Sequence, residues 1–412
     1  MSKFKPTNIK GGCDSIPSEQ ILRNRVIDVL KKNFESYGFA PIETSSLNYL
    51  EMLTHKYERD AEIVREIYKI RDQGDRDLGL RFDLTVPFAK FIATNRNIRM
   101  PFRRYEIGKV WRNGPVKAGR LREFYQCDID VVGITGQAVE AEIIALGIKC
   151  FLDLGITPVV KYNNRLGLVK QLSVGSYKIA EHDIDKVISI IDRIEKDSRD
   201  DIIKQLEKFM PRTNATALLD SFKNPTKHPE IVELEKELKE YGVLQYCEFS
   251  PSLARGLNYY TGTIWEVYDK AGRISSSLGG GGRYDNMVTE WVDNGLHYPS
   301  VGMAFGLEPI MVLLEKSNTK TSIVDIMIVP MVQSDIQDKL RKTGVRVLTW
   351  HGDKVGKAFE YADKENIPYV TVIGEREISG GKIKIKNMKT GEEREFNTID
   401  ISKILGYITH YE

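Results

Sequence analysis

Five arginines and Lys117 crowd into the twenty positions from Arg103 to Arg122, in and around the loop NGPVKAGR. They are Arg103, Arg104, Arg112, Lys117, Arg120 and Arg122. Guanidinium groups stay charged and bind phosphate oxygens in pairs, so this density suits a polyphosphate or the end of a nucleic acid. The alternative is a solvated hairpin at a sheet edge, whose basic side chains discourage pairing with other strands.

Polar residues alternate along the expected strand that follows this loop. Side chains alternate between the two faces of a strand, so Gln126, Asp128 and Asp130 share one face and the apolar residues between them share the other. One face of this strand therefore carries an amide and two carboxylates.

The stretch RGLNYYTGTIWEVY, residues 255–268, adds a permanently charged donor, Arg255, and two adjacent tyrosines, Tyr259 and Tyr260. In a regular strand the two tyrosines would point to opposite faces, and Gly262 would mark a bulge or a close approach. Taken alone, the pair is also typical of core tyrosines.

A glycine run, LGGGGRYDNMV, spans residues 278–288. Its spacing matches neither the dinucleotide fingerprint nor the Walker phosphate loop, which disfavours both kinds of site. The run is either a cradle for a ligand or neighbouring strand, or a glycine-rich tight turn.

These residues need a frame of strands and helices. Residues 18–37 have helical periodicity and are followed by Gly38, which is a helix stop signal. Strands are expected through APIETSSL and around residues 80–83, after which Thr85 can cap a helix. Residues 102–133 read as two long strands joined by the basic loop. Further strands, a glycine run and a helix are expected over 250–315.

The composition is that of a globular protein, with 412 residues, 41% hydrophobic, 29% charged and a net charge of +2. The pattern predicts a core of residues 1–165 and 246–316, a helical insertion at 166–245, a linker at 317–322 and a small α/β domain at 323–412. No apolar run reaches about 18 residues, the length that would suit a membrane span. The four cysteines are far apart, so we expect a cytoplasmic protein with reduced thiols and no structural metal site.

Taken together, these motifs resemble the histidyl-tRNA synthetases, which are class II aminoacyl-tRNA synthetases. The resemblance rests on LRFDLTVPFAKFIA, REFYQCDIDVVG, RGLNYYTGT, GGGGRYDNMV and SVGMAFGLE, and it extends over nearly the whole chain. It implies an α/β fold class. An α+β catalytic core would hold an antiparallel sheet with flanking helices, joined by a helical insertion and a small C-terminal α/β anticodon-binding domain.

The same resemblance implies roles for individual residues. Histidine would be bound by Asp83, Leu84, Thr85, Arg112, Gln126, Asp130, Arg255, Tyr259 and Tyr260. ATP would be bound by Arg112, Arg120, Glu123 and Arg255, with Arg112 and Arg255 acting in catalysis. Candidate tRNA contacts are Lys117 and a row on one strand face, Lys382, Lys384 and Lys386. For that row, a solvated edge strand is the alternative.

The implied reaction joins histidine to ATP, with Mg²⁺ as the counter-ion and no tightly bound metal, and then transfers the histidyl group to tRNA(His). Positioning and charge neutralisation would supply most of the catalysis. The resemblance also implies a homodimer.

Four positions depart from the family pattern. Gly114 stands where an acidic residue is expected, Pro309 where an arginine is expected, Asn258 for an aspartate and Ser45 for a proline. Substitutes for the missing guanidinium could be Lys109, Lys117 or Arg283.

These departures keep two alternatives to a ligase open. The first is a catalytically impaired synthetase paralogue that binds histidine or tRNA as a sensor or regulator. The second is the regulatory subunit of the first enzyme of histidine biosynthesis, against which residues 323–412 count, because that relative lacks the anticodon-binding domain.

Overall fold

The computed structural model describes residues 5–12, 14–55, 62–117, 119–174, 177–195, 197–254, 259–314, 322–352, 354–398 and 400–409. The chain divides into two compact units, one formed mainly by residues 25–314 and the other mainly by residues 315–412. Within the described ranges, no helix is long and apolar enough to cross a membrane.

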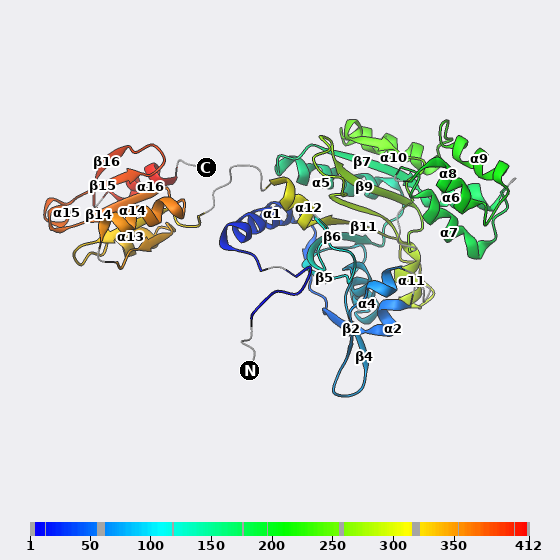
Figure 1. The fold of residues 1–412 in the computed structure, drawn as a ribbon, viewed down its shortest axis with the longest axis horizontal. Helices are drawn as coiled ribbons and strands as arrows, with labels where there is room; N and C mark the ends of the chain where they lie inside the picture. The colour runs from blue at the N-terminus through cyan, green and yellow to red at the C-terminus, as the bar shows by residue number, and fades with distance from the viewer. Residues whose placement is uncertain are drawn as a thin grey trace. The chain divides into compact units, whose positions relative to one another are not determined.

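The first unit is built on a large mixed sheet with the strand order β1-β5-β6-β11-β10-β9-β7-β8 (Figure 1). Its strands are β1 (Ala40–Pro41), β5 (Phe102–Trp111), β6 (Glu123–Val132), β7 (Pro158–Asn164), β8 (Cys247–Phe249), β9 (Thr263–Asp269), β10 (Gly279–Arg283) and β11 (Ser300–Gly306). The pairs β1–β5 and β7–β8 are parallel, and the other neighbours are antiparallel. Residues 102–133 therefore form the two long strands predicted from the sequence.

The register of β5 against β6 decides which charges meet. Arg104 lies opposite Asp130, Glu106 opposite Asp128, and Gly108 opposite Gln126. Because alternate residues share a face, the polar residues of both strands meet on one side of the sheet. The other side is apolar and is covered by helices.

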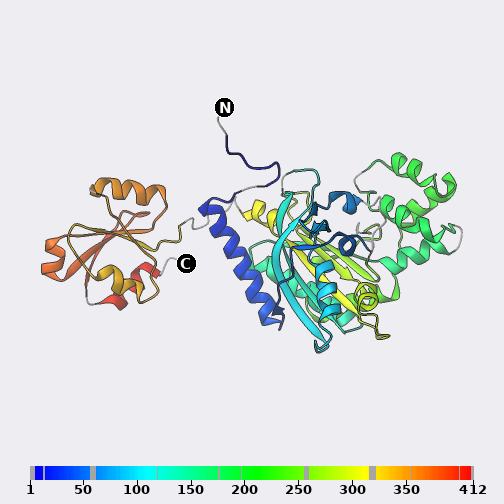
Figure 2. The same cartoon turned by 90° about the horizontal axis from the view of Figure 1, so that it is seen from below.

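Two helices pack on that apolar side, α1 (Pro17–Ser36) and α5 (Gln137–Asp153). The ring of Phe34 in α1 lies 5.5 Å from the ring of Phe305 in β11, and the ring of Phe151 in α5 lies 5.4 Å from the same ring. Figure 2 shows α1 running along the strands of the sheet. The polar face is thus left for smaller elements to cover.

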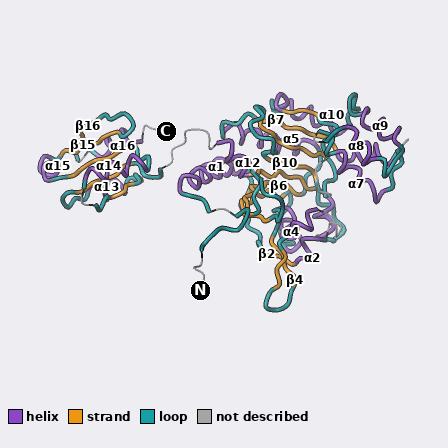
Figure 3. The backbone as a smooth tube through the Cα atoms, in the orientation of Figure 1, coloured by secondary structure: helices purple, strands orange, loops and turns teal. Residues whose placement is uncertain are grey.

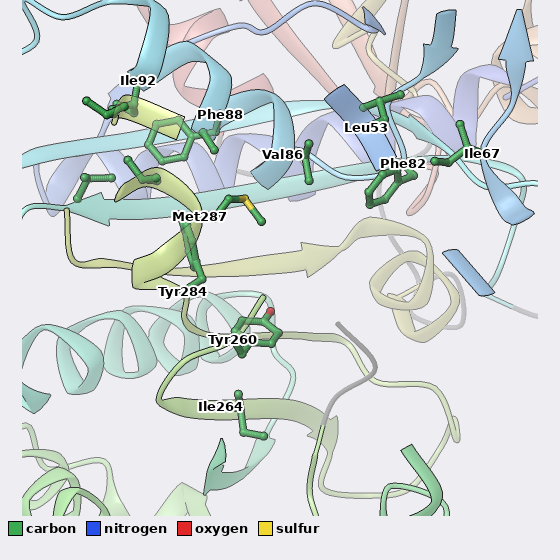
Figure 4. Packing of buried hydrophobic residues seen from close by; sticks show 14 of the residues in the cluster. Leu53, Ile67, Phe82, Val86, Phe88, Ile92, Tyr260, Ile264, Tyr284 and Met287 are labelled. Atoms are coloured by element: carbon green, nitrogen blue, oxygen red, sulfur yellow. The ribbon is translucent and has the colours of Figure 1, made fainter. Parts of the chain in front are cut away.

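Short elements surround the polar face. A three-stranded sheet has the order β2 (Leu47–Tyr49), β4 (Asp77–Leu80), β3 (Lys69–Arg71). The neighbouring helices are α2 (Leu50–Thr54), α3 (Glu62–Glu66), α4 (Thr85–Thr94) and α11 (Asp285–Val292), whereas α12 (Leu307–Leu314) follows β11 and contacts β6. A buried cluster ties several of these elements together, and Figure 4 shows Phe82, Val86 and Phe88 on one side of it and Tyr260, Tyr284 and Met287 on the other.

The start of α4 differs from the prediction that Thr85 caps this helix. Thr85 is the first helical residue, and Leu84 at the N-cap provides no side-chain bond. Instead, Oδ1 of Asp83 accepts a hydrogen bond of 3.0 Å from the backbone amide of Val86. The predicted cap was therefore wrong: a carboxylate two residues earlier meets this amide, which also anchors one oxygen of Asp83.

The helical segment contains α6 (Arg165–Ser173), α7 (Glu181–Ile191), α8 (Arg199–Leu206), α9 (Arg212–Ser221) and α10 (Pro229–Glu240), followed by the short 3₁₀ helix η1 (Leu244–Tyr246). Figure 3 shows α7, α8 and α9 gathered as one group of helices. The described members of its hydrophobic cluster come from α6 to α9 and from the segments beside them, and α10 contacts α5 instead.

The second unit is a five-stranded sheet with the order β13 (Val347–Thr349), β12 (Ile326–Pro330), β14 (Tyr369–Ile373), β15 (Lys382–Asn387), β16 (Glu393–Asn397). Its helices are α13 (Ile336–Arg341), α14 (Val355–Lys364), α15 (Glu375–Gly380) and α16 (Ile401–Thr409). One hydrophobic cluster joins α14 to the sheet, and a second joins α13 and α16 to it. The alternative that the lysine row lies on an edge strand is wrong, because β15 pairs with both β14 and β16.

Candidate active site

A cavity of about 360 Å³ opens on the polar face of the large sheet. Eight of the predicted site residues line it: Asp83, Thr85, Arg112, Arg120, Gln126, Asp130, Tyr259 and Tyr260. They come from the segment that runs into α4, from the hairpin loop and strand β6, and from the segment before β9. The fold therefore brings together residues that span nearly 180 positions of the sequence.

Other predicted residues lie elsewhere. Leu84 is fully buried in the core. Glu123 accepts hydrogen bonds from Lys109 at 2.5 Å and from Nε1 of Trp111 at 3.0 Å, outside the cavity lining. Lys117 is exposed on the hairpin loop. Arg255 and Asn258 lie outside the described residues, so their predicted roles stay predictions.

Asp130 is held by two buried partners. The hydroxyl of Tyr284 donates to its Oδ1 at 2.5 Å, and Nη2 of Arg104 lies 2.5 Å from its Oδ2. Arg104 is fully buried, and its guanidinium lies over the ring of Phe88 at 4.4 Å. Burial raises the pKa of Asp130, and the charge of Arg104 opposes that rise. The ion pair of Arg104 and Asp130 therefore holds part of the cavity wall in place.

A second buried pair supports the first one. Nη1 of Arg81 lies 2.8 Å from Oε1 of Glu106, which also accepts from the backbone amide and the hydroxyl of Thr44, both at 2.9 Å. Buried charges persist when they are paired and their remaining atoms are hydrogen-bonded. This network fixes β5 beneath the cavity.

Asp83 lines the cavity with one oxygen already bound to the start of α4. Burial raises the pKa of its carboxyl to about 6, while the amide of Val86 and the charges of Arg112 and Arg104 oppose that rise. A cation that enters the cavity would stabilise the ionised form of this carboxyl and so lower its pKa.

The two tyrosines do not point to opposite faces, so that expectation was wrong. Their ring centres lie 4.7 Å apart, both line the cavity, and Tyr259 also meets the edge of the Tyr284 ring at 5.9 Å. The reason is that β9 begins only at Thr263. Tyr259 and Tyr260 precede that strand, and the amide of Thr261 donates to the carbonyl of Arg283 at 2.8 Å.

The glycine run is strand β10, not a tight turn. A Cβ at Gly281 would collide with the carbonyl of Gly302 and with Trp265, and a Cβ at Gly282 would come within 2.8 Å of the Tyr260 ring. The absence of side chains lets neighbouring strands and the tyrosine approach the backbone.

Arg112 is fixed at the cavity wall from the side of the protein. Its Nε donates to the carbonyl of Phe82 at 2.9 Å, and its guanidinium lies 5.3 Å from the ring of Phe124. A guanidinium held in one plane loses less entropy when it binds a phosphate.

Glu66 is a cavity residue that the sequence interpretation missed. Its Oε1 lies 3.2 Å from Nη2 of Arg120, and its backbone carbonyl accepts from the amide of Asn113 at 2.8 Å. A Cβ at Gly114 would collide with the Glu66 carboxylate. An acidic group therefore sits beside position 114, although the residue there is glycine. No local pattern predicts this contact, because the two segments meet only in the folded chain.

The structure also bears on the three candidates for replacing the guanidinium expected at position 309, of which Lys117 is exposed and outside the cavity lining. Arg283 is buried and paired with Glu140 at 2.6 Å and with Asp285 at 3.2 Å. Lys109 is paired with Glu123. Gly119, by contrast, lies beside Pro309, since its Cβ would be 3.5 Å from the Pro309 Cα. The next residue, Arg120, lines the cavity and brings a guanidinium group to this neighbourhood.

The fold matches a known class of enzyme. A solved structure of histidyl-tRNA synthetase from Nostoc sp. PCC 7120 is similar with a TM-score of 0.82 and 28% sequence identity, covering 98% of this chain and 100% of that chain. A mixed α/β chain with this large sheet and this small C-terminal domain is thus an aminoacyl-tRNA synthetase by class, and the predicted fold class is confirmed.

Sequence comparisons identify the family. The family model for histidyl-tRNA synthetase matches residues 11–310, and the one for the anticodon binding domain matches residues 325–410. Histidine–tRNA ligase 1 of a Bacillus cereus strain is 40% identical over 414 residues, which cover 94% of this chain and 96% of the relative. Histidine–tRNA ligase 2 of Shouchella clausii is 36% identical over 421 residues, covering 96% and 99%. The chain belongs to the histidyl-tRNA synthetase family, as the motifs indicated.

Proposed function

We propose that this chain is a histidine–tRNA ligase, which forms histidyl-adenylate from histidine and ATP and transfers the histidyl group to tRNA(His). The observation that carries the proposal is the cavity in which buried carboxylates and two arginines meet, in a chain of this family. The carboxylates suit the cationic end of an amino acid, and the arginines suit its carboxylate and the phosphates of a nucleotide.

The reaction needs positioning more than covalent help. An oxygen of the histidine carboxylate attacks the α-phosphorus of ATP in line, and pyrophosphate leaves. A ribose hydroxyl of the tRNA then attacks the carbonyl carbon of the adenylate, and AMP leaves. Arg112, fixed by the carbonyl of Phe82, neutralises charge that develops on the transferring phosphoryl group. Mg²⁺ enters with ATP as part of the substrate. Arg255 would neutralise charge on the phosphoryl group together with Arg112.

Two contacts support catalysis despite the departures from the family pattern. Glu66 supplies a carboxylate beside Gly114, and Arg120 brings a guanidinium to the cavity from the loop that lies beside Pro309. The charges that positions 114 and 309 do not provide are therefore available from neighbouring segments. The match of residues 325–410 to an anticodon-binding domain likewise favours a ligase over a regulatory subunit without that domain.

Further parts of the proposal concern partners. Lys117 lies on the exposed hairpin loop, and Lys382, Lys384 and Lys386 lie along β15, where they are candidate contacts for tRNA phosphates. Lys382 is paired with Glu395 at 2.7 Å and Lys384 with Glu393 at 3.6 Å, so RNA would have to compete with these carboxylates. We also propose a homodimer in the cytoplasm, as the family resemblance implies.

The test is histidine-dependent exchange between ATP and pyrophosphate with the purified chain and Mg²⁺, beside calorimetry of histidine binding. Exchange with histidine and with no other amino acid is the expected result. Histidine binding without exchange would contradict the ligase and indicate a sensor that has lost adenylate chemistry. Absence of both would contradict the histidine pocket itself.

A further inference from the structure

Asp130 was predicted to contact the ligand, yet its two carboxylate oxygens are already engaged by the protein. Oδ1 accepts from Tyr284, and Oδ2 lies in an ion pair with Arg104, although it has no hydrogen-bond partner among the described residues. All three side chains are buried. A ligand that bound Asp130 would share oxygens that already have strong, charge-assisted partners. Asp130 therefore helps to hold the cavity wall, and its contact with the ligand stays a prediction.

Asp128 lies two residues earlier on the same face of β6 and has a different environment. Its side chain is buried, with 2% of the residue exposed, and it lines the cavity. Its Oδ1 has no hydrogen-bond partner among the residues that the structure describes. Across the sheet it faces Glu106 on one side and the small Ala304 on the other. An unbonded buried carboxylate oxygen is costly, so it is a natural place for a donor from a ligand.

Three further oxygens of the described cavity lining share this property, and one of them, Oδ2 of Asp130, lies in the ion pair with Arg104. Oδ2 of Asp83 and Oε1 of Gln126 are also buried in the lining without a hydrogen-bond partner in the described part of the chain. Burial, together with the neighbouring charges of Asp130, Asp83 and Glu106, raises the pKa of the Asp128 carboxyl well above its usual range, while Arg104 opposes that rise. The oxygens of Asp128, Asp83 and Gln126 therefore suit a ligand group that is positively charged and carries several N–H donors.

We propose that Asp128 binds the α-ammonium group of the amino acid substrate, together with Asp83 and Gln126. An ammonium group offers a hydrogen to each of the three acceptors and adds a positive charge beside two buried carboxyls. The inference rests on the proposed function in taking histidine as the substrate. It assigns to Asp128 a contact that separates amino acids from ligands that carry the same ring without an amino group.

The experiment compares three ligands by calorimetry: histidine, L-histidinol and 3-(imidazol-4-yl)propionate. Histidinol keeps the ammonium group and replaces the carboxylate by an alcohol, whereas imidazolepropionate keeps the ring and the carboxylate and lacks the ammonium. The proteins are the full-length wild type, Asp128→Ala and the isosteric Asp128→Asn. Asp128→Ala is expected to weaken histidine and histidinol by the same factor, about 10- to 100-fold, as for the loss of a hydrogen bond to a charged group.

Imidazolepropionate is expected to bind all three proteins equally. Asp128→Asn should fall between wild type and Asp128→Ala for the first two ligands, because its amide oxygen still accepts a hydrogen bond but carries no charge. The matched control is Glu140→Gln, a buried carboxyl paired with Arg283 outside the cavity lining. This variant should bind all three ligands as the wild type does.

Two results would overturn the proposal. The first is unchanged histidine affinity in Asp128→Ala and Asp128→Asn. The second is an equal loss for imidazolepropionate, which would indicate a contact with the ring or a general change of the cavity. Wild-type protein that does not bind histidine would instead contradict the proposed function, so the two failures are distinguishable.

Discussion

The hairpin of β5 and β6 carries ion pairs near both of its ends, and the two sets have opposite surroundings. At the open end, away from the loop, Arg104 pairs with Asp130, and neither is more than 3% exposed. At the loop end, Lys109 pairs with Glu123, and these side chains are 43% and 36% exposed. The same two strands thus hold one pair that water cannot reach and another that water surrounds.

The difference in burial suggests different purposes: the buried pair maintains the structure, and the exposed end of the hairpin binds ligands. A buried pair with further hydrogen bonds has one arrangement, and removing a member leaves an uncompensated charge in a medium of low dielectric. A solvated pair can exchange its partner for water or for a ligand at little cost. We therefore expect the open end to maintain the shape of the cavity. We expect the loop end, with Arg112 and Arg120 beside it, to bind the phosphates.

The largest expected effect comes from removing the Arg104–Asp130 ion pair at the open end of the hairpin. Arg104→Met should lower the free energy of unfolding by about 3–5 kcal/mol, because it leaves Asp130, Asp128 and Glu106 without their shared cation. Urea denaturation measures this loss. The control is Arg103→Met on the same strand, whose partner Glu142 is partly exposed and whose removal should cost less than about 1 kcal/mol. Equal losses in the two variants would refute the distinction.

The next effect concerns catalysis at the loop end. Arg112→Ala should slow histidine-dependent ATP–pyrophosphate exchange by about a hundred- to a thousand-fold, as for the removal of one group that stabilises charge in a transition state. The unfolding midpoint should change little. Lys109→Met is the comparison, because its ion pair lies outside the cavity lining and exchange should persist. An Arg112→Ala protein that is as unstable as Arg104→Met would show a structural role instead.

A smaller effect is a pH dependence of stability that Asp83 contributes. Burial raises the pKa of this carboxyl from 3.8 to about 6, so the native state keeps a proton that the unfolded chain releases above pH 4. Stability therefore falls as the pH rises from about 4 to about 6 and then levels off, by a total of about 2–3 kcal/mol. Urea denaturation of the wild type and of Asp83→Asn across this range measures the difference. If the two curves stay parallel, the carboxyl is ionised throughout.

The smallest effect on stability is expected for the lysines of β15, of which Lys382 and Lys384 are exposed and Lys386 is half-buried. Changing Lys382, Lys384 and Lys386 to glutamate should leave the fold intact and weaken tRNA binding. The slope of log affinity against log salt concentration should fall by up to about 3 units, one for each phosphate contact. Lys403→Glu, at another exposed position of the same unit, is the control. Unchanged tRNA affinity would exclude this surface from RNA binding.

Local patterns predicted the parts of the site that depend on a single element. Alternation along β6 indicated that Gln126, Asp128 and Asp130 share a face, and all three line the cavity. The pair Tyr259 and Tyr260 was misread, because the bend that precedes β9 depends on a bond to the backbone of Arg283, which is remote in sequence. Alternation holds within a strand, but it does not say where the strand begins.

Contacts between distant segments were beyond the sequence. Glu66 meets Arg120 across 54 positions, and the pairing of Arg104 with Asp130 depends on the register of two strands. The division into a core, a helical insertion at 166–245, a linker and a C-terminal domain stays a prediction. The contact of α10 with α5 links the last helix of the predicted insertion to the helix that covers the large sheet.

The glycine at position 302 has a consequence for how this chain tolerates change. A Cβ there would collide with Oδ1 of Asp130, the oxygen that accepts from Tyr284. Even alanine would therefore displace the Asp130 carboxylate, which pairs with Arg104 at the open end of the hairpin. In a library of all single substitutions selected for growth, position 302 should admit no replacement, whereas Gly356, with open space where its side chain would be, should admit many.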